Sequence, residues 1–362
     1  MSGLKQPVLG VVSTALVMVV SLAFIHLFSF ALFAGWIATF LLSLIPMEIV
    51  MGVTWGMREP RFVAERPQPV RGILYSLLAL IAGVIVVLVH WVVVGTAISP
   101  PTPIYTQCMI ASVVIMFWLA IVWGGWPFSA FIKNPIAVGI ALMIACYAIN
   151  YIFFRLMFNF DFLRHAPGYV ASQDPHGWFN ATTCVVMYVT GITPMFLTLC
   201  FDLWPFTKSK TLMKQPVLGI VWTAVCLAIG FTAYYIGVGI YKMDPQDFLT
   251  EVPIPFLFGT IFMLNMLQNS VFAKFQQPLK GVLNMLAAAI CGNAFSLMYR
   301  ALEPSITGKI ETGPPAYQSE IWLASALLSV TFPFLVAYVD FFTMWPLQRA
   351  TTEKVMETAT GR

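Results

Sequence analysis

The chain has 362 residues, of which 59% are hydrophobic and only 9% are charged. Soluble domains carry about 25% charged residues, so this composition supplies too little polar side chain to cover a surface that faces water. A soluble globular protein is therefore excluded. The net charge of +4 is small and scattered, and we expect it to orient the chain in a lipid bilayer and not to bind nucleic acid.

A short signature recurs five times: an amide residue, then proline, then glycine about one turn later. Each copy stands at the start of a hydrophobic run, and each interval between copies is long enough for two membrane-spanning helices. Recurrence at such intervals predicts an internal repeat of a two-helix unit. The copies are Gln6-Pro7 with Gly10, Gln68-Pro69 with Gly72, Asn134-Pro135 with Gly139, Gln215-Pro216 with Gly219, and Gln277-Pro278 with Gly281.

Each residue of the signature suits the start of a membrane helix. Proline fits the first turn because its fixed φ is already helical and its missing N–H would have no partner there. The amide side chain helps to satisfy the open helix end, and the glycine lets another backbone approach closely, as packed membrane helices require. The alternative is a direct ligand role for these ends, since helix N-termini attract anions.

The sequence thus predicts an all-α polytopic membrane protein with about ten transmembrane helices in a single membrane domain, residues 1–362. Two spans per unit give successive units the same topology, so the five repeats are parallel. We place the repeats at about 5–62, 63–128, 129–208, 209–273 and 274–348, followed by a tail at 349–362. The predicted spans are 8–32, 36–55, 70–97, 104–126, 136–160, 182–204, 217–241, 253–272, 279–299 and 321–345.

Charged residues divide between the two ends of these spans. Most lysines and arginines flank the ends that carry the signature, which we call the basic side. By the positive-inside rule this side is cytoplasmic, and so are both termini and the tail; we expect the plasma (inner) membrane. The opposite side, which we call the acidic side, carries the loop residues Asp161, Asp174, Asp244, Asp247, Glu251, Glu303 and Glu311.

Three carboxylates interrupt the second helices of repeats one, three and five. Ionisable groups inside a bilayer are costly and mark ion or substrate paths by default. Each acid also follows a proline within its span, and such a proline exposes backbone carbonyls. We therefore predict a proton- or cation-linked site. The three acids are Glu48, Asp202 and Asp340. Asp202 and Asp340 lie near the basic side, where an acid can alternatively reach water or a loop lysine.

The first helices carry polar groups toward the acidic side. If the repeats surround an axis, these groups line one vestibule, and its arginines attract an anionic solute. The alternative is that they extend to the level of the lipid headgroups. The candidates for a substrate or ion path are Asn150, Arg155, Tyr235, Asn293 and Arg300.

His26 and His90 occupy similar depths in adjacent repeats, which admits a shared haem b as an alternative. His165 and His176 share a loop with two aspartates, Asp161 and Asp174, where a metal ion or plain solvation both account for the pattern. We predict neither a cofactor nor a metal.

Familiar catalytic motifs are absent from the sequence, including the P-loop, the dinucleotide fingerprint, HExxH and GxSxG. This makes an enzyme the weaker interpretation. The predicted function is a transporter or channel-like protein for a small polar, anionic or aromatic solute. The alternative is a non-catalytic membrane subunit that anchors or assembles a larger, possibly electron-transfer, complex with other protein subunits.

Overall fold

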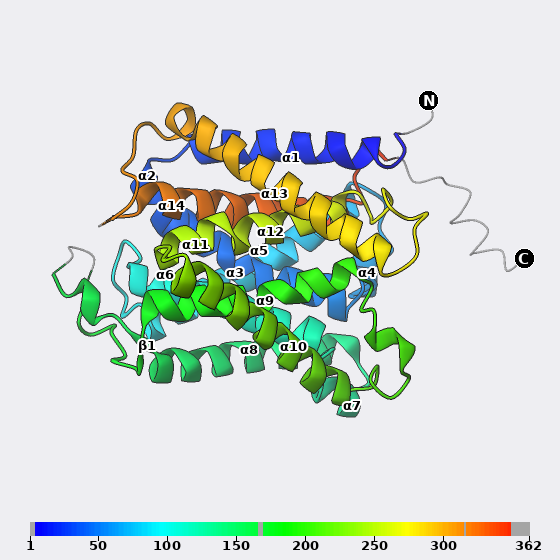
Figure 1. The fold of residues 1–362 in the computed structure, drawn as a ribbon, viewed down its shortest axis with the longest axis horizontal. Helices are drawn as coiled ribbons and strands as arrows, with labels where there is room; N and C mark the ends of the chain where they lie inside the picture. Colours follow the sequence, from blue (N-terminus) through cyan, green and yellow to red (C-terminus); the bar gives the residue numbers. More distant parts are fainter. Residues whose placement is uncertain (1–3, 166–168, 315, 349–362) are drawn as a thin grey trace, which may run out of the picture.

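The computed structural model describes residues 4–165, 169–314 and 316–348 (Figure 1). Ten helices of this described part are long and apolar enough to cross a membrane, which confirms the predicted all-α multi-pass class. The predicted tail, 349–362, lies outside the described residues. The spans are Val8–His26, Phe30–Thr54, Val70–Val93, Pro103–Val122, Pro135–Met157, Ala181–Cys200, Val217–Ile240, Pro245–Met266, Leu279–Ile306 and Gln318–Phe341.

The first helix of each predicted repeat belongs to a set that we call the outer helices. These are α1 (Val8–His26), α5 (Val70–Val93), α8 (Pro135–Met157), α10 (Val217–Tyr234) and α13 (Leu279–Ile306). A π-helical segment, η6 (Tyr235–Ile240), extends α10. Short helices α4 (Arg61–Ala64), α7 (Phe128–Phe131) and η5 (Phe206–Lys208) lie in connections on the basic side.

The second helices form a set that we call the inner helices, and most of them combine α-helical and π-helical segments. Their α-helical parts are α2 (Phe30–Leu32) with α3 (Ala38–Ile49), α6 (Pro103–Phe117), α9 (Ala181–Cys200), α11 (Pro245–Glu251) with α12 (Pro253–Ile261), and α14 (Gln318–Ala324) with α15 (Phe332–Val336). Their π-helical parts are η1 (Phe33–Ile37), η2 (Val50–Thr54), η3 (Trp118–Val122), η7 (Phe262–Met266), η8 (Ser325–Thr331) and η9 (Ala337–Phe341). On the acidic side, β1 (Phe158–Asn159) pairs in parallel with β2 (Phe179–Asn180), and η4 (Asp161–Leu163) follows β1.

The inner helices contact one another in a closed ring. Contacts run from α3 to α6, from α6 to α9, from α9 to α12 and from α11 to α14, and the tenth span returns to α3 through η8 and α15. Apart from the first pair of spans, the apolar stretches of the inner helices are 61–72% buried, whereas those of the outer helices are only 28–33% buried. The inner helices therefore form the core, and the outer helices present their remaining faces to lipid.

Each outer helix packs on the inner helix that precedes it in the chain. Thus α5 packs on α3, α8 on α6, α10 on α9 and α13 on α12, while α1 packs on η8 and α15 of the last inner helix. Figure 1 shows α1 and α13 side by side along one edge of the bundle, both running away from the basic side, which lies at the right.

The signature glutamine links two helices at the basic side. Its side-chain oxygen accepts a bond from the signature glycine N–H, in the pairs Gln6–Gly10, Gln68–Gly72, Gln215–Gly219 and Gln277–Gly281. Its side-chain nitrogen donates to a carbonyl at the end of an inner helix, in the pairs Gln6–Met266, Gln68–Phe341, Gln215–Val122 and Gln277–Cys200, at 2.7–3.5 Å. The predicted role of the amide is confirmed for these four glutamines. The predicted close approach of a backbone holds at Gly10, where an added Cβ would overlap the Met266 carbonyl. At Gly72, Gly219 and Gly281 the Cβ would instead overlap the aromatic side chain of the residue that follows the inner helix.

A second recurrent feature is a turn of two left-handed residues directly after each inner helix. Glycine occupies both positions in one copy and one position in another; the remaining residues adopt φ of 50–58° with a side chain. The same rare turn after all five inner helices supports the predicted division into five repeats, which we keep as a prediction. The pairs are Gly56-Met57, Gly124-Gly125, Asp202-Leu203, Gln268-Asn269 and Thr343-Met344.

Most predicted span ends lie within a few residues of the observed ones, but the eighth span begins at Pro245 instead of residue 253. Asp244 caps this helix by accepting from the Gln246 N–H, and Asp247 and Glu251 lie on the helix itself and not in a loop. Similarly, α13 continues past residue 299 to Ile306 and carries Glu303. The acidic residues misled the prediction because they occupy helix ends at the acidic side.

Candidate functional site

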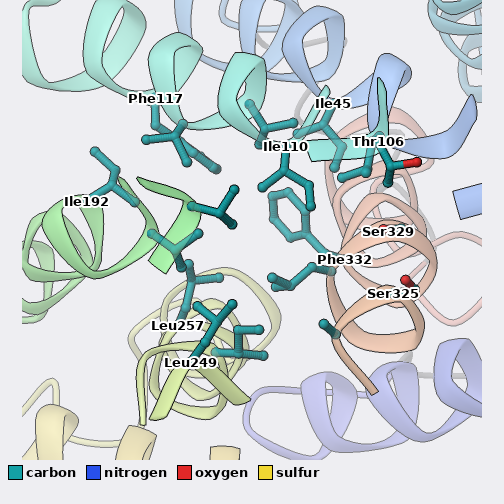
Figure 2. Close-up of a pocket in the computed structure, with 18 residues that line it drawn as sticks. Ile45, Thr106, Ile110, Phe117, Ile192, Leu249, Leu257, Ser325, Ser329 and Phe332 are labelled. Atoms are coloured by element: carbon teal, nitrogen blue, oxygen red, sulfur yellow. The ribbon is translucent and has the colours of Figure 1, made fainter. Parts of the chain in front are cut away.

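A cavity of about 90 Å³ lies at the centre of the inner ring. All five inner helices contribute side chains to it, and Figure 2 shows them converging from every side. Leu42 and Ile45 come from α3, for example, and Leu257 comes from α12. The lining is almost entirely aliphatic or aromatic, and the three hydroxyl groups are those of Thr106, Ser325 and Ser329.

This cavity is large enough for about three water molecules at ~30 Å³ each, but apolar cavities of such size stay dry. An apolar cavity of this kind offers an ion nothing in place of its hydration shell. The centre of the inner ring is thus an almost wholly apolar hollow.

Glu48 lies on α3 three residues after the lining residue Ile45, about 4.5 Å farther toward the basic side, and is not itself among the residues that line the cavity. Only 4% of the residue is exposed. Its Oε2 atom has no hydrogen-bond partner within the described part of the chain. A buried, unpaired carboxylate oxygen costs free energy, and proteins retain such groups where they bind protons or cations.

Asp340 lies in η9 of the neighbouring inner helix and points at the continuation of α3. A Cβ added at Gly52, one turn beyond Glu48, would be 3.0 Å from Asp340 Oδ2. The two acids are near enough for their charges to repel each other, and the charge of Arg71 on α5 acts on Asp340 as well. Arg71 donates from Nη2 to the Met57 carbonyl at 3.1 Å, while its buried Nε has no partner among the residues described. The structure thus brings the predicted acids Glu48 and Asp340 close together and places Arg71 near Asp340.

Asp202, the third predicted acid, lies elsewhere. It follows the end of α9, in a left-handed turn at the basic side. Its carboxylate accepts bonds from Lys280 Nζ at 2.8 Å, Gln277 Nε2 at 2.8 Å and Asn269 Nδ2 at 3.2 Å. The geometry matches the alternative stated for this residue, a bond to a basic-side lysine, and Asp202 joins α9 to the start of α13.

We expect Asp202→Asn to lower the stability of the folded protein modestly, by about 0.5–1 kcal/mol, because the pair is half exposed and water screens it. Partial burial raises the pKa of the Asp202 carboxyl, but the bonds from Lys280 and Gln277 outweigh this and hold the pKa below its ordinary value. This stabilisation is therefore present above the unfolded pKa of about 3.9 and is lost as the pH falls through the lower folded pKa. Thermal unfolding in detergent at pH 7 and at about pH 2 measures it; an equal loss on Lys280→Met is expected.

The polar residues predicted on the outer helices do not line the cavity. Arg155 and Asn293 are exposed, and Tyr235 is 65% exposed, so all three are on the lipid-facing layer. Arg300 faces Glu251 at 3.9 Å on the acidic side. Asn150 is buried, and it donates to the Cys108 carbonyl at 3.0 Å, which holds α8 against α6. Neither arginine supplies positive charge to the ring centre.

The histidines also have separate neighbours. His26 bonds to the Ile306 carbonyl at 2.8 Å, whereas the ring of His90 bonds to Val86 at 3.3 Å and packs on Tyr147 with ring centroids 4.8 Å apart. The structure does not bring the two predicted haem ligands together.

In the acidic-side loop, ligand-capable atoms of Asp161, Asp174 and His176 lie within 4.8 Å of one another, without His165. Arg164 already pairs with Asp161 at 2.7 Å. Desolvation raises the pKa of Asp161, but the bond and the charge of Arg164 outweigh it and lower this pKa below its ordinary value. The Asp174 side chain is buried, and it accepts bonds from the Tyr169 hydroxyl and from the Phe160 and His176 N–H groups.

The acidic side of the ring carries carboxylates that are largely buried. Glu303 on α13 accepts from the Ser319 hydroxyl, and Glu320 on α14 accepts from the Gly313 N–H at 3.1 Å. Tyr317 donates to Asp244 at 2.9 Å; desolvation and this carboxylate raise the pKa of Tyr317 to about 12. The acidic-side ends of the eighth, ninth and tenth spans, which we call the acidic mouth, thus carry several carboxylates.

Sequence reasoning missed the cavity, Glu320 and the position of Arg71. The cavity is lined by ordinary apolar residues, which carry no signal in a membrane protein. Arg71, by contrast, follows the second signature proline by two residues and was counted only as a basic-side charge. Comparison with family models, with curated proteins and with solved structures found no match for this chain.

Proposed function

We propose that this multi-pass membrane protein is a transporter or channel-like protein whose pathway runs through the centre of the inner ring and carries protons or a small cation. The observation that carries the proposal is Glu48: a buried carboxylate with an unpaired oxygen, next to a cavity that all five inner helices enclose. Such a group binds a proton or cation at modest cost, since no existing hydrogen bond has to be broken.

The charges along the proposed pathway favour a cation over the anionic solute expected from sequence. Glu48 and Asp340 lie toward the basic side, and Glu303 and Glu320 lie near the other mouth. Both arginines that were expected to attract anions are away from the centre. An anion entering this ring meets an apolar cavity and the carboxylates of Glu48 and Asp340, with Arg71 acting on Asp340 alone of the two.

The test is a flux measurement in liposomes that enclose a pH-sensitive dye, with proton entry driven by a potassium diffusion potential. We expect the purified protein to admit protons faster than protein-free liposomes, or to carry Na⁺ or K⁺ in the equivalent isotope assay. Val189→Phe is expected to lower this flux severalfold because Val189 lines the cavity and the larger ring fills it.

Val84→Phe is the matched control, since Val84 is 43% exposed on the lipid-facing side of α5. Equal inhibition by both variants would place the path elsewhere. Flux no greater than in protein-free liposomes for all three ions would remove the proposal and favour the membrane-subunit alternative, which predicts stable protein partners after gentle purification.

A further inference from the structure

A second, much larger hollow of about 740 Å³ lies away from the ring centre, between the outer helices α8 and α10. Its floor is formed by α6 with η3 and by α9, so four consecutive spans enclose it. We call it the lateral groove. It extends from Trp126 near the basic side to Met157 and Phe179 near the acidic side, and its lining is almost wholly apolar. A groove of this length and character is filled by hydrocarbon in a bilayer.

The helices that line the lateral groove are joined at the basic side by two connections, residues 123–134 and 201–216. After Asp202, which is paired with Lys280, these connections contain no acidic residue. They carry four lysines, all exposed, and none has a carboxylate partner in the part of the chain described. One of them, Lys208, stacks on Trp204 with its Nζ 5.2 Å from the ring centre. The four are Lys133, Lys208, Lys210 and Lys214.

The lining of the lateral groove adds aromatic groups at its basic end. Three tryptophans of the lining, Trp118, Trp123 and Trp126, occupy the same basic-side half.

The outer helix on one side of the groove also departs from the common pattern. The other four signatures use glutamine to bond to an inner-helix end, but Asn134 only caps its own helix, by accepting from the Ile136 and Ala137 N–H groups. Instead, Trp55 Nε1 donates to the Pro135 carbonyl at 2.9 Å. The start of α8 is therefore held toward the second span and not by the link that fixes the other outer helices.

We propose that the lateral groove is a binding site for an anionic phospholipid, with acyl chain in the groove and phosphate at the lysines of residues 201–216. Charge decides the class: the connections at the basic end of the groove carry lysines without a carboxylate partner among the described residues, and these rim charges attract an anionic headgroup and offer nothing specific to a zwitterionic one. Lys133 is set apart from them, because it lines a smaller hollow with Val53 and Thr54 of the second span. Basic pockets between membrane helices on the cytoplasmic side bind anionic lipids in this way.

The experiment uses the intact protein in phosphatidylcholine vesicles and measures tryptophan quenching by brominated lipids. Brominated phosphatidylglycerol is expected to reach half-maximal quenching at about one tenth of the mole fraction that brominated phosphatidylcholine requires, as the rim charges predict. The preference is expected to shrink as NaCl is raised from low to high concentration, because salt screens exposed charges.

Two variants separate the headgroup and chain contributions. Lys210→Gln with Lys214→Gln is expected to abolish the preference, whereas Lys242→Gln with Lys309→Gln, on the acidic side, leaves it unchanged. Gly191→Leu is expected to reduce quenching by both lipids, since Gly191 lines the groove and a Cβ there meets only Leu227 at 3.5 Å. Ala228→Leu, on the exposed face of α10, is its control.

Equal quenching by the two lipids in the wild type would overturn the proposal, because the groove then holds only whatever lipid surrounds it. Retention of the preference in the Lys210 and Lys214 variant would overturn it as well. A protein subunit that co-purifies in the groove and shields it from both lipids is a third contradicting outcome. The salt series needs no variant, so the proposal stays testable if a substitution prevents folding.

Discussion

Replacing Gly292 with alanine is expected to lower the thermal midpoint of the purified protein by roughly 5 °C, corresponding to about 3 kcal/mol. The α12 and α13 backbones approach so closely that a Cβ on Gly292 would overlap the Pro255 carbonyl, and one on Gly259 would overlap the Ala288 carbonyl. Backbone atoms cannot rotate away as side chains do, so the helices must separate and lose contact along their length. Gly259→Ala is expected to have the same effect.

Thermal unfolding followed by size-exclusion chromatography in detergent measures this loss. Gly35→Ala serves as the control, since the nearest atom to its added Cβ is Pro101 Cδ at 4.0 Å, and alanine also favours a helix over glycine. A midpoint for Gly292→Ala equal to that of Gly35→Ala would contradict the close approach of α12 and α13.

The second large effect concerns Glu48. Glu48→Gln keeps the shape of the side chain but can neither carry negative charge nor exchange a proton at neutral pH, so we expect flux to fall at least about tenfold in the liposome assay. The folded state is expected to persist, because Oε2 makes no hydrogen bond that the substitution would remove within the residues described. We therefore expect Glu48→Gln to lose flux while its thermal midpoint stays unchanged.

Glu311→Gln is the matched control, because Glu311 is exposed on the acidic side, away from the ring centre. Glu48→Asp is expected to restore part of the flux, since it returns the charge at a slightly different position. Flux that survives in Glu48→Gln would show that this carboxylate lies off the pathway.

Much of the fold was predictable because a bilayer imposes simple rules. Apolar runs of fixed length and a helix-starting signature were sufficient for ten spans and an all-α class, which the structure confirms. The arrangement of the spans in two layers was not predicted: the outer span is the more apolar one in four of the five predicted repeats, but the order reverses in the last. Burial separates them only after folding, through helix contacts that hydropathy does not record.

The candidate site was predicted in part, for a related reason. A carboxylate within an apolar run is visible in sequence, and Glu48 stood out on that ground. Which acids meet depends on the ring: Asp340 is 292 positions away from Glu48 in the chain yet lies on the adjacent helix, whereas Asp202 turns outward to Lys280. Polar groups on the outer helices, such as Tyr235 and Asn293, looked equally suggestive but face the lipid layer.

The bond from Gln6 to the Met266 carbonyl joins the start of the first span to the end of the eighth. During translation at about 5–20 residues per second, Met266 is made roughly 10 to 50 seconds after Gln6. Until then α1 lacks its main partners, which belong to the eighth, ninth and tenth spans. Assembly of this protein is therefore completed at its first span, and whatever holds α1 nearby during the wait, whether lipid or the insertion machinery, takes part in its biogenesis.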